Sequence, residues 1–124
     1  MAANKTVRFG PVAITTSVAN ILNPGTTTGG VNMPSGSGNL FFIIKHIRIV
    51  NKAAAAKTIS AWLGATGGSA AGTELGFSGT SVPANSYIDW YGLLRMDVAD
   101  FLTMQAEANT SLVFQAEGEV GVAG

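Results

Sequence analysis

The chain has 124 residues, a formal net charge of zero at pH 7 and no cysteine. This length suits one domain with its own core, and the missing cysteine excludes disulfide bonds, thiolate nucleophiles and cysteine metal sites. Seven basic residues without a cluster give little support for nucleic acid or a membrane surface as a partner, so we expect neither.

Charged residues make up only 11% of the chain. The fourteen charged side chains correspond to one charge per about 440 Å² of the roughly 6,200 Å² that a folded 12.7 kDa monomer exposes. This is sparser than a surface built for solubility. We therefore expect a surface rich in Ser, Thr, Asn and Gly, part of which is buried against other chains.

Short β-strand patterns recur along the chain, and helix patterns are almost absent. In chain order the expected strands are TVRFG, VAIT, FFIIKHIRIVN, TISAWL, TELGF, SYIDWYG, DFLTMQA, SLVFQAE and EVGV. Stretches rich in Gly, Pro and Asn separate them. The sequence therefore predicts an all-β fold, a β-sandwich or jelly roll of about eight or nine short antiparallel strands, in one domain over residues 1–124.

Two segments are expected to become ordered on a partner. Residues 1–9 are predicted to form an extended N-terminal arm with one compact apolar anchor, and such a terminus is disordered unless something holds it. Residues 23–38 form a long loop without periodicity, and its two central apolar side chains have nothing local to bury them. The predicted partner contacts in these segments are Val7, Phe9, Val31 and Met33.

The segment FFIIKHIRIVNK, residues 41–52, is typical of one long strand. The odd-numbered apolar positions are expected to face the core: Phe41, Ile43, Ile47 and Ile49. The even-numbered polar positions are expected to face a neighbouring subunit or solvent: His46, Arg48 and Lys52. Lys45 falls on the wrong face in this alternation, which predicts a β-bulge near Ile44 and Lys45, or a place for Lys45 at the rim of the sandwich.

The segment that begins at Met96 predicts a turn at residues 97–100 and then a strand. In that strand Leu102, Met104 and Ala106 share one face. In SYIDWYG, Ile88 and Trp90 are expected to face the core. The opposite face of SYIDWYG carries Tyr87, Asp89 and Tyr91, which suits a sugar site or a subunit interface.

Candidate catalytic and metal-binding residues are few. His46 is the only histidine, and no nucleophile or carboxylate at a fixed spacing accompanies it, so we expect a structural or interface role on a face shared with Phe42, Ile44 and Arg48. Two loose acidic pairs, Asp97 with Asp100 and Glu117 with Glu119, are interpreted as a turn and as a solvated or inter-subunit face rather than as a calcium site. We predict no enzyme activity, no metal and no cofactor. On the two outward faces the predicted partner contacts are His46, Arg48, Tyr87 and Tyr91.

Two longer segments resemble a widespread group of small virion proteins of tailed bacteriophages. They are LFFIIKHIRIVNKAAAAKTISAWLG and VPANSYIDWYGLLRMDVADFLTMQAEANTSLVFQAEGEVGV. In that group a strand that ends in an asparagine and small residues leads to a second strand. A PANS turn before a Trp, a D-x-L strand, a polar hairpin and a final G-x-E strand follow. The resemblance covers residues 40–122, about two thirds of the chain.

This resemblance implies a non-enzymatic β-sandwich protein that decorates and stabilises the capsid, that is, a decoration or cement protein. It implies the major capsid protein as partner, a homo-oligomer with a trimer favoured, and a place on the capsid exterior after synthesis in the host cytoplasm. A tail or baseplate component and a carbohydrate-binding jelly-roll module are the alternatives.

Overall fold

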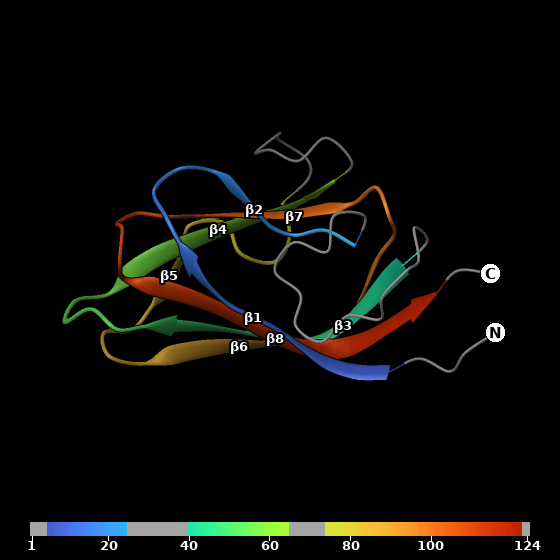
Figure 1. Ribbon diagram of the computed structural model, residues 1–124. Coiled ribbons are helices and arrows are strands. Elements are labelled where there is room, and N and C mark those ends of the chain that lie inside the picture. Colours follow the sequence, from blue (N-terminus) through green and yellow to red (C-terminus); the bar gives the residue numbers. More distant parts are fainter. Residues whose placement is uncertain (1–4, 25–39, 65–73, 123–124) are drawn as a thin grey trace.

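The computed structural model describes residues 5–24, 40–64 and 74–122 (Figure 1). The described part of the chain contains eight strands: β1 (Lys5–Ile14), β2 (Ala19–Leu22), β3 (Leu40–Asn51), β4 (Lys57–Gly64), β5 (Thr80–Val82), β6 (Tyr87–Met96), β7 (Phe101–Ala106) and β8 (Leu112–Val122). None of the described residues belongs to a helix with the length and apolar character needed to cross a membrane.

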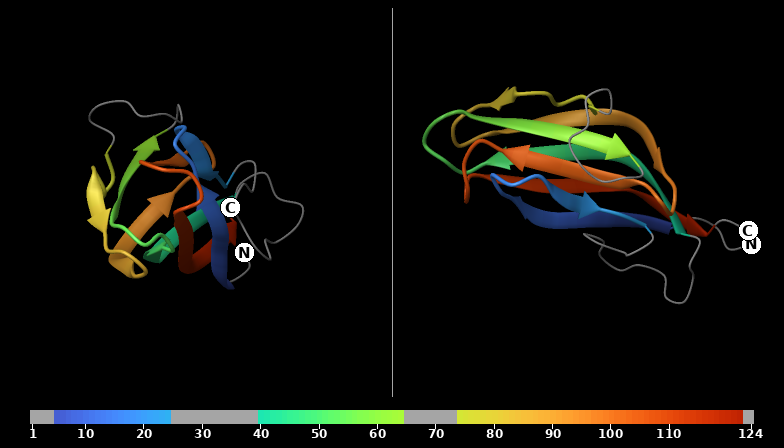
Figure 2. Two further views of the ribbon diagram at one scale, coloured as in Figure 1. Left: turned by 90° about the vertical axis from the view of Figure 1, so that its left-hand side faces the viewer. Right: turned by 90° about the horizontal axis from the view of Figure 1, so that it is seen from above.

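The strands form two four-stranded antiparallel sheets that pack face to face (Figures 1 and 2). Sheet A has the order β1-β8-β3-β6, and sheet B has the order β2-β7-β4-β5. The pairing is nested, because β1 pairs with β8, β2 with β7, β3 with β6 and β4 with β5. The prediction of an all-β sandwich with antiparallel strands is confirmed.

The core lies between the two sheets and is built from alternate residues of each strand, as the period of a half-buried strand requires. Sheet B contributes the predicted face of β7, where Leu102, Met104 and Ala106 are all buried. Sheet A contributes large side chains of β1, β3 and β8, of which Phe9 and Phe42 pack with their rings 4.7 Å apart. At 25 cal/mol for each Å² of apolar area, burying one such ring stabilises the fold by about 1.5–3 kcal/mol.

A β-bulge in β3 divides its core face into two halves. The register against both β6 and β8 shifts between Ile44 and His46, which confirms the predicted bulge. The core assignment before the bulge was wrong, because Phe42 and Ile44 are buried and Phe41 and Ile43 are not. With respect to β8, Lys45 is an extra residue and reverses the alternation of β3, whereas against β6 it faces both Gly92 and Leu93. Even positions therefore face the core before the bulge, and Ile47 and Ile49 face it afterwards, as predicted.

The N-terminal segment is part of sheet A from Lys5 onward, rather than an arm over residues 1–9. Val7 and Phe9 alternate with exposed neighbours along β1 and point into the core. The prediction that they contact a partner is therefore wrong, since the Phe9 side chain has no exposed surface. Residues 1–4 lie outside the described residues.

The start of the long loop, which was predicted as residues 23–38, is fixed to a distant turn. Asn23 is buried, and its side-chain amide donates to the carbonyl oxygen of Asp100 at 2.5 Å. The predicted turn at residues 97–100 is confirmed by a bond of 2.9 Å from the Asp100 amide to the Asp97 carbonyl. Val31 and Met33 lie outside the described residues.

Two turns at one end of the sandwich are joined by hydrogen bonds. The side chain of buried Asn51, the last residue of β3, donates to the carbonyls of Ala55 and Val82 at 3.0 Å and accepts from the amide of Ala53 at 2.8 Å. Its main-chain amide donates to Ser86 in the turn before β6. In that turn Asn85 has a left-handed φ of 50° and donates its amide to Ala53. The asparagine after β3 and the PANS turn therefore form one unit.

Some strand boundaries differ from those expected. TVRFG and VAIT are one strand, with a register shift between Phe9 and Val12, and SLVFQAE and EVGV are also one strand. The described part of TELGF is not a strand: it makes an isolated bridge from Glu74 to Trp62, and Leu75 and Phe77 form main-chain hydrogen bonds with Ala61. The short strand β2, with the sequence ANIL, was not expected.

Candidate interaction surface on the outer face of sheet A

Half of the charged side chains of this charge-poor chain lie on the outer face of sheet A. They come from all four strands, at positions that alternate with the buried ones. The seven residues are Arg8, Lys45, Arg48, Asp89, Arg95, Glu117 and Glu119. The expected sparse charge is therefore concentrated on one face.

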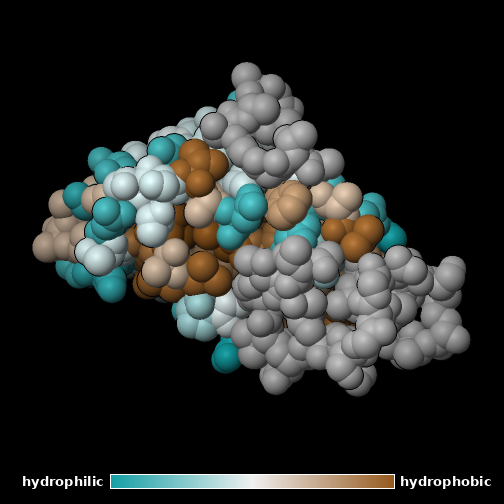
Figure 3. All heavy atoms as spheres, turned by 45° about the horizontal axis from the view of Figure 1, so that its top comes forward, coloured by the Kyte–Doolittle hydropathy of each residue, from teal (hydrophilic) through white to brown (hydrophobic). Residues whose placement is uncertain are grey.

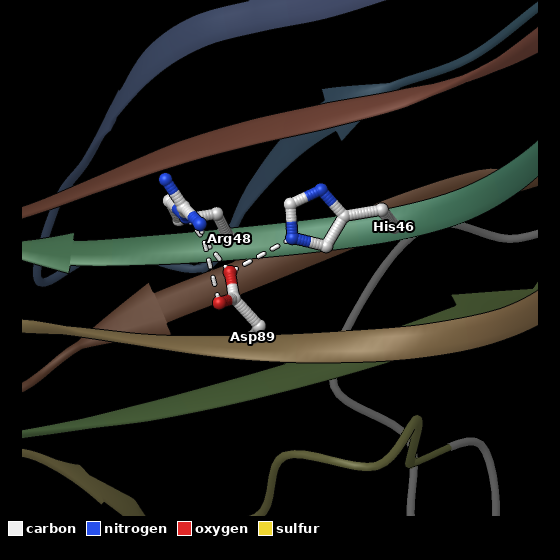
Figure 4. A network of polar contacts seen from close by, with 3 residues as sticks. All are labelled: His46, Arg48 and Asp89. Atoms are coloured by element: carbon white, nitrogen blue, oxygen red, sulfur yellow. Dashed lines mark hydrogen bonds and ion pairs between the residues drawn. The ribbon is translucent and has the colours of Figure 1, made fainter.

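The centre of this face is a three-residue ionic cluster that bridges β3 and β6. Arg48 donates from Nε to Oδ1 of Asp89 at 2.8 Å and from Nη2 to Oδ2 at 3.3 Å. His46 Nε2 lies 2.8 Å from the same Oδ1. Figure 4 shows both side chains of β3 converging on the carboxylate of β6. The register that places Arg48 beside Asp89 brings the three together.

The cluster holds Asp89 in its ionised form. The pKa of Asp89 is lowered mainly by the hydrogen bond from Arg48 and further by His46, against a smaller opposing effect of burial. The same bond raises the pKa of Arg48. A carboxylate with a lowered pKa is a weak proton acceptor, and efficient general bases have a pKa near the working pH. The cluster is therefore suited to holding these three side chains in fixed positions on the surface rather than to transferring protons.

Two exposed tyrosines flank the cluster. Tyr91 is 70% exposed and stacks on the His46 ring, with centroids 4.6 Å apart and planes inclined by 14°. Tyr87 is 50% exposed, and the Arg48 guanidinium lies over its ring at 4.1 Å. The structure thus brings together His46, Arg48, Tyr87 and Tyr91, the four predicted contact residues of these strands. His46 shares this face with Arg48, as predicted. The prediction that Phe42 and Ile44 also lie on this face is wrong, because they precede the bulge and point inward.

A small hollow adjoins the cluster on the side of β8 and β1. It measures about 50 Å³ and is lined by Arg8, His46, Arg48, Gln115, Ala116 and Glu117. This volume suits a partner side chain or a few waters, since pockets for cofactors are several-fold larger. Arg8, Gln115 and Glu117 were not among the predicted partner contacts, although Glu117 was expected on a solvated or inter-subunit face. The only available signal was that Glu117 and Glu119 share a face.

The outer face of sheet B is different, because its central side chains are mostly Ser, Thr and Gln. A shallow hollow of about 320 Å³ on this side is lined by Thr16, Thr58, Ser60, Gln105, Ala106 and Glu107. Its polar groups bond within the chain: Gln105 donates to the carbonyl of Thr16, and Glu107 accepts from the amide of Thr58. Figure 3 turns the side of sheet B forward, and the coloured surface there mixes hydrophilic and hydrophobic residues.

Among the described residues, no group of three or more His, Asp or Glu side chains is placed to hold a metal ion. The two acidic pairs have other contacts. Asp100 accepts from the amide of Asp97 at 2.8 Å, which closes their turn. Glu119 pairs with Lys45 across the sheet.

Comparison with known proteins finds no protein family model that matches the chain and no matching curated protein. The likeness to phage virion proteins therefore rests on the short motifs of the sequence itself.

Proposed function

We propose that the chain is a non-enzymatic structural protein of a bacteriophage virion, which decorates and stabilises the capsid as a homo-oligomer. The proposal rests mainly on one observation: two motifs of the resemblance are hydrogen-bonded to each other in the folded chain. The asparagine after β3 and the PANS turn, which the chain has in common with small virion proteins, hold each other through main-chain and side-chain hydrogen bonds. In this chain the two motifs therefore form one hydrogen-bonded unit between the end of β3 and the start of β6.

We further propose that the sandwich is a jelly roll. The nested pairing of β1 with β8 through to β4 with β5 supports this, because it is the pattern of one long hairpin folded over on itself. Jelly rolls of eight strands are frequent in viral capsid proteins, and also in lectin domains.

The outer face of sheet A is the proposed attachment surface for the major capsid protein on the capsid exterior. Tyr and Arg are the residues that contribute most binding energy in protein interfaces. On this face Arg48, Tyr87 and Tyr91 are already held by neighbours, so little side-chain freedom is lost when they are covered.

A carbohydrate-binding role is the second candidate, favoured by the exposure of Tyr91 beside Asp89. It is the weaker one, since sugars stack on aromatic faces and one face of each tyrosine ring is already covered, by His46 and by Arg48. Specific binding on a glycan array, abolished by Tyr91→Ala, would replace the virion proposal with this one.

Quantitative mass spectrometry of purified particles from the phage or prophage that encodes the chain tests the proposal. A copy number comparable with that of the major capsid protein is expected. A handful of copies for each particle would assign the protein to the tail or baseplate. Complete absence from the particles would overturn the proposal.

A further inference from the structure

The two edge strands of sheet A differ in how open they are to another strand. In the part of the chain that the structure describes, β1 pairs only with β8 and β6 pairs only with β3. Strand β1 carries two basic residues and a proline, namely Lys5, Arg8 and Pro11. If the β1 edges of two molecules paired, positive charges would face each other, and the proline would have no main-chain N–H to donate. Lysine, proline and bulges are the usual protection of an edge strand. β6 has ten residues with no lysine and no proline.

The exposed side chains of β6 are apolar at its centre. Leu93 is 77% exposed and is the most exposed large hydrophobic side chain of the described residues, followed by Tyr91 at 70%. Both lie on the outer face, between Asp89 and Arg95. An apolar centre flanked by opposite charges on a free edge is suited to main-chain pairing with another strand.

The sequence of β6 is complementary to itself when it is read in opposite directions about Gly92. In the segment DWYGLLR, an antiparallel copy centred there places Asp89 opposite Arg95 and Tyr91 opposite Leu93. On the inner face it places half-buried Trp90 opposite Leu94. Gly92 lies opposite itself, where β6 is irregular because Gly92 and Leu93 together face Lys45 of β3. The Trp90 ring covers the inner side of Gly92, 2.9 Å from where a Cβ atom would be, so the outer side is the one open to the second copy.

We propose that β6 of one molecule pairs antiparallel with β6 of a second molecule about a two-fold axis through Gly92. Two-fold contacts are isologous, so each complementary pair occurs twice. The product is one continuous eight-stranded sheet made from two copies of the four-stranded sheet A.

Neighbouring registers lack this complementarity. Centring on Tyr91 places Asp89 opposite Leu93, and centring on Leu93 places Asp89 opposite Asp97, a pair of like charges. Registers centred between two residues place the outer face of one copy beside the inner face of the other, which period-two alternation forbids.

The charged groups have bonding capacity left for the second copy. Asp89 accepts both short contacts on Oδ1, and Oδ2 has only the 3.3 Å contact from Arg48. Arg95 donates to Asp97 from Nε and lies over the Phe41 ring, so it must turn outward to reach Asp89 of the second copy. The apolar pair of Tyr91 and Leu93 is therefore the main contact, and the ion pair sets the register.

This pairing concerns the free protein and does not depend on the virion proposal. It gives a dimer in place of the trimer that the resemblance implies. A failure of one proposal therefore leaves the other standing, because the dimer is measured with purified protein and the virion role with particles.

Light scattering over a concentration series is the first test. The wild-type protein should have a mass of twice 12.7 kDa, and Leu93→Lys should raise the dissociation constant of the dimer at least tenfold. Val18→Lys is the matched control, because Val18 is also an exposed hydrophobic residue but lies away from β6, between β1 and β2. A monomeric or trimeric wild type, or a Leu93→Lys dimer of unchanged affinity, would overturn the proposal.

Disulfide crosslinking reads the register directly, since the chain has no cysteine of its own. Directly opposed residues have Cβ atoms about 4.5–5.5 Å apart, near the span of a disulfide. An oxidised mixture of Tyr91→Cys and Leu93→Cys should give crosslinked dimer faster than either variant alone. Faster crosslinking within one variant alone, or none in the mixture, would contradict the register centred on Gly92.

Discussion

Gly118 of β8 lies against the main chain of Ile43 in β3, so closely that a Cβ atom at position 118 would be 2.0 Å from the Ile43 carbonyl oxygen. The contact is with backbone, which cannot rotate aside as the end of a side chain can. Gly118 is also the register partner of Ile44, the last residue before the bulge. The absence of a side chain at Gly118 therefore allows β8 to approach β3 closely next to the bulge.

Replacement of Gly118 by alanine should lower the free energy of unfolding by about 3 kcal/mol, the upper end for overpacking, because strand β3 or β8 must shift. Urea unfolding followed by tryptophan fluorescence measures this. Gly79→Ala is the comparison: it has open space around it and only the strain of a φ of 62°, with an expected cost of about 1 kcal/mol. Equal losses of unfolding free energy in Gly118→Ala and Gly79→Ala would show that β3 and β8 can move apart at little cost.

Asn51→Ala should also be strongly destabilising, by about 3 kcal/mol, since it leaves the buried carbonyl of Val82 and the amide of Ala53 without their partner. Asn109→Ala is the matched control. Asn109 is exposed, and its side chain accepts one bond, from the amide of Thr16, so its loss costs about 1 kcal/mol. Calorimetry of the two variants compares them, and an Asn51→Ala protein as stable as Asn109→Ala would contradict the proposed role of the joined turns.

Acid should weaken the fold through Asp89. Its pKa is lower in the folded chain than in the unfolded one, because Arg48 and His46 stabilise the ionised form. The resulting stabilisation is complete above the unfolded pKa of about 4 and is lost as the pH falls through the folded value. Asp89→Asn should be less stable than the wild type at pH 7, and the difference should shrink toward pH 2–3. A difference that does not change with pH would exclude this linkage.

Attachment through the outer face of sheet A predicts that Arg8→Glu weakens binding to particles that lack the protein. Arg8 lines the small hollow on this face, and reversal of its charge changes the face without touching the core. Lys52→Glu is the matched control, because Lys52 is also exposed but lies in the turn after β3. Sedimentation of particles with each variant measures binding. Unchanged occupancy by Arg8→Glu would indicate that another surface attaches.

Local alternation predicted most strands, and it found the bulge in β3 because a lysine interrupted an apolar pattern. It did not determine which side of the strand enters the core before the bulge. Phe41 and Phe42 are adjacent, as are Ile43 and Ile44, so either phase satisfies a local count. The choice depends on pairing with β8, where buried Phe42 lies beside buried Val120. Such pairing is not visible in a single strand.

The candidate surface was predicted in parts and not as a whole. Alternation within β6 placed Tyr87, Asp89 and Tyr91 on one outward face, and the structure confirms this. What the sequence could not provide is the register between β3 and β6, which lie about forty residues apart and place Asp89 between His46 and Arg48. For the same reason Val7 and Phe9 were assigned to an arm, since their strand partner β8 is at the other end of the chain.

The nested pairing has a consequence for how the chain reaches this structure. Of the eight described strands β1 is synthesised first, but its only described neighbour in the sheet is β8, which is synthesised after the other seven. Among the described strands, β4 and β5 are the only paired strands that follow each other in the chain, and each further pair of the nest encloses a longer loop. Folding should therefore proceed outward from the centre, and the pair of β1 with β8 can close only after β8 has left the ribosome. A nascent chain that stops before Leu112 leaves β1 with an unpaired edge that is prone to aggregate.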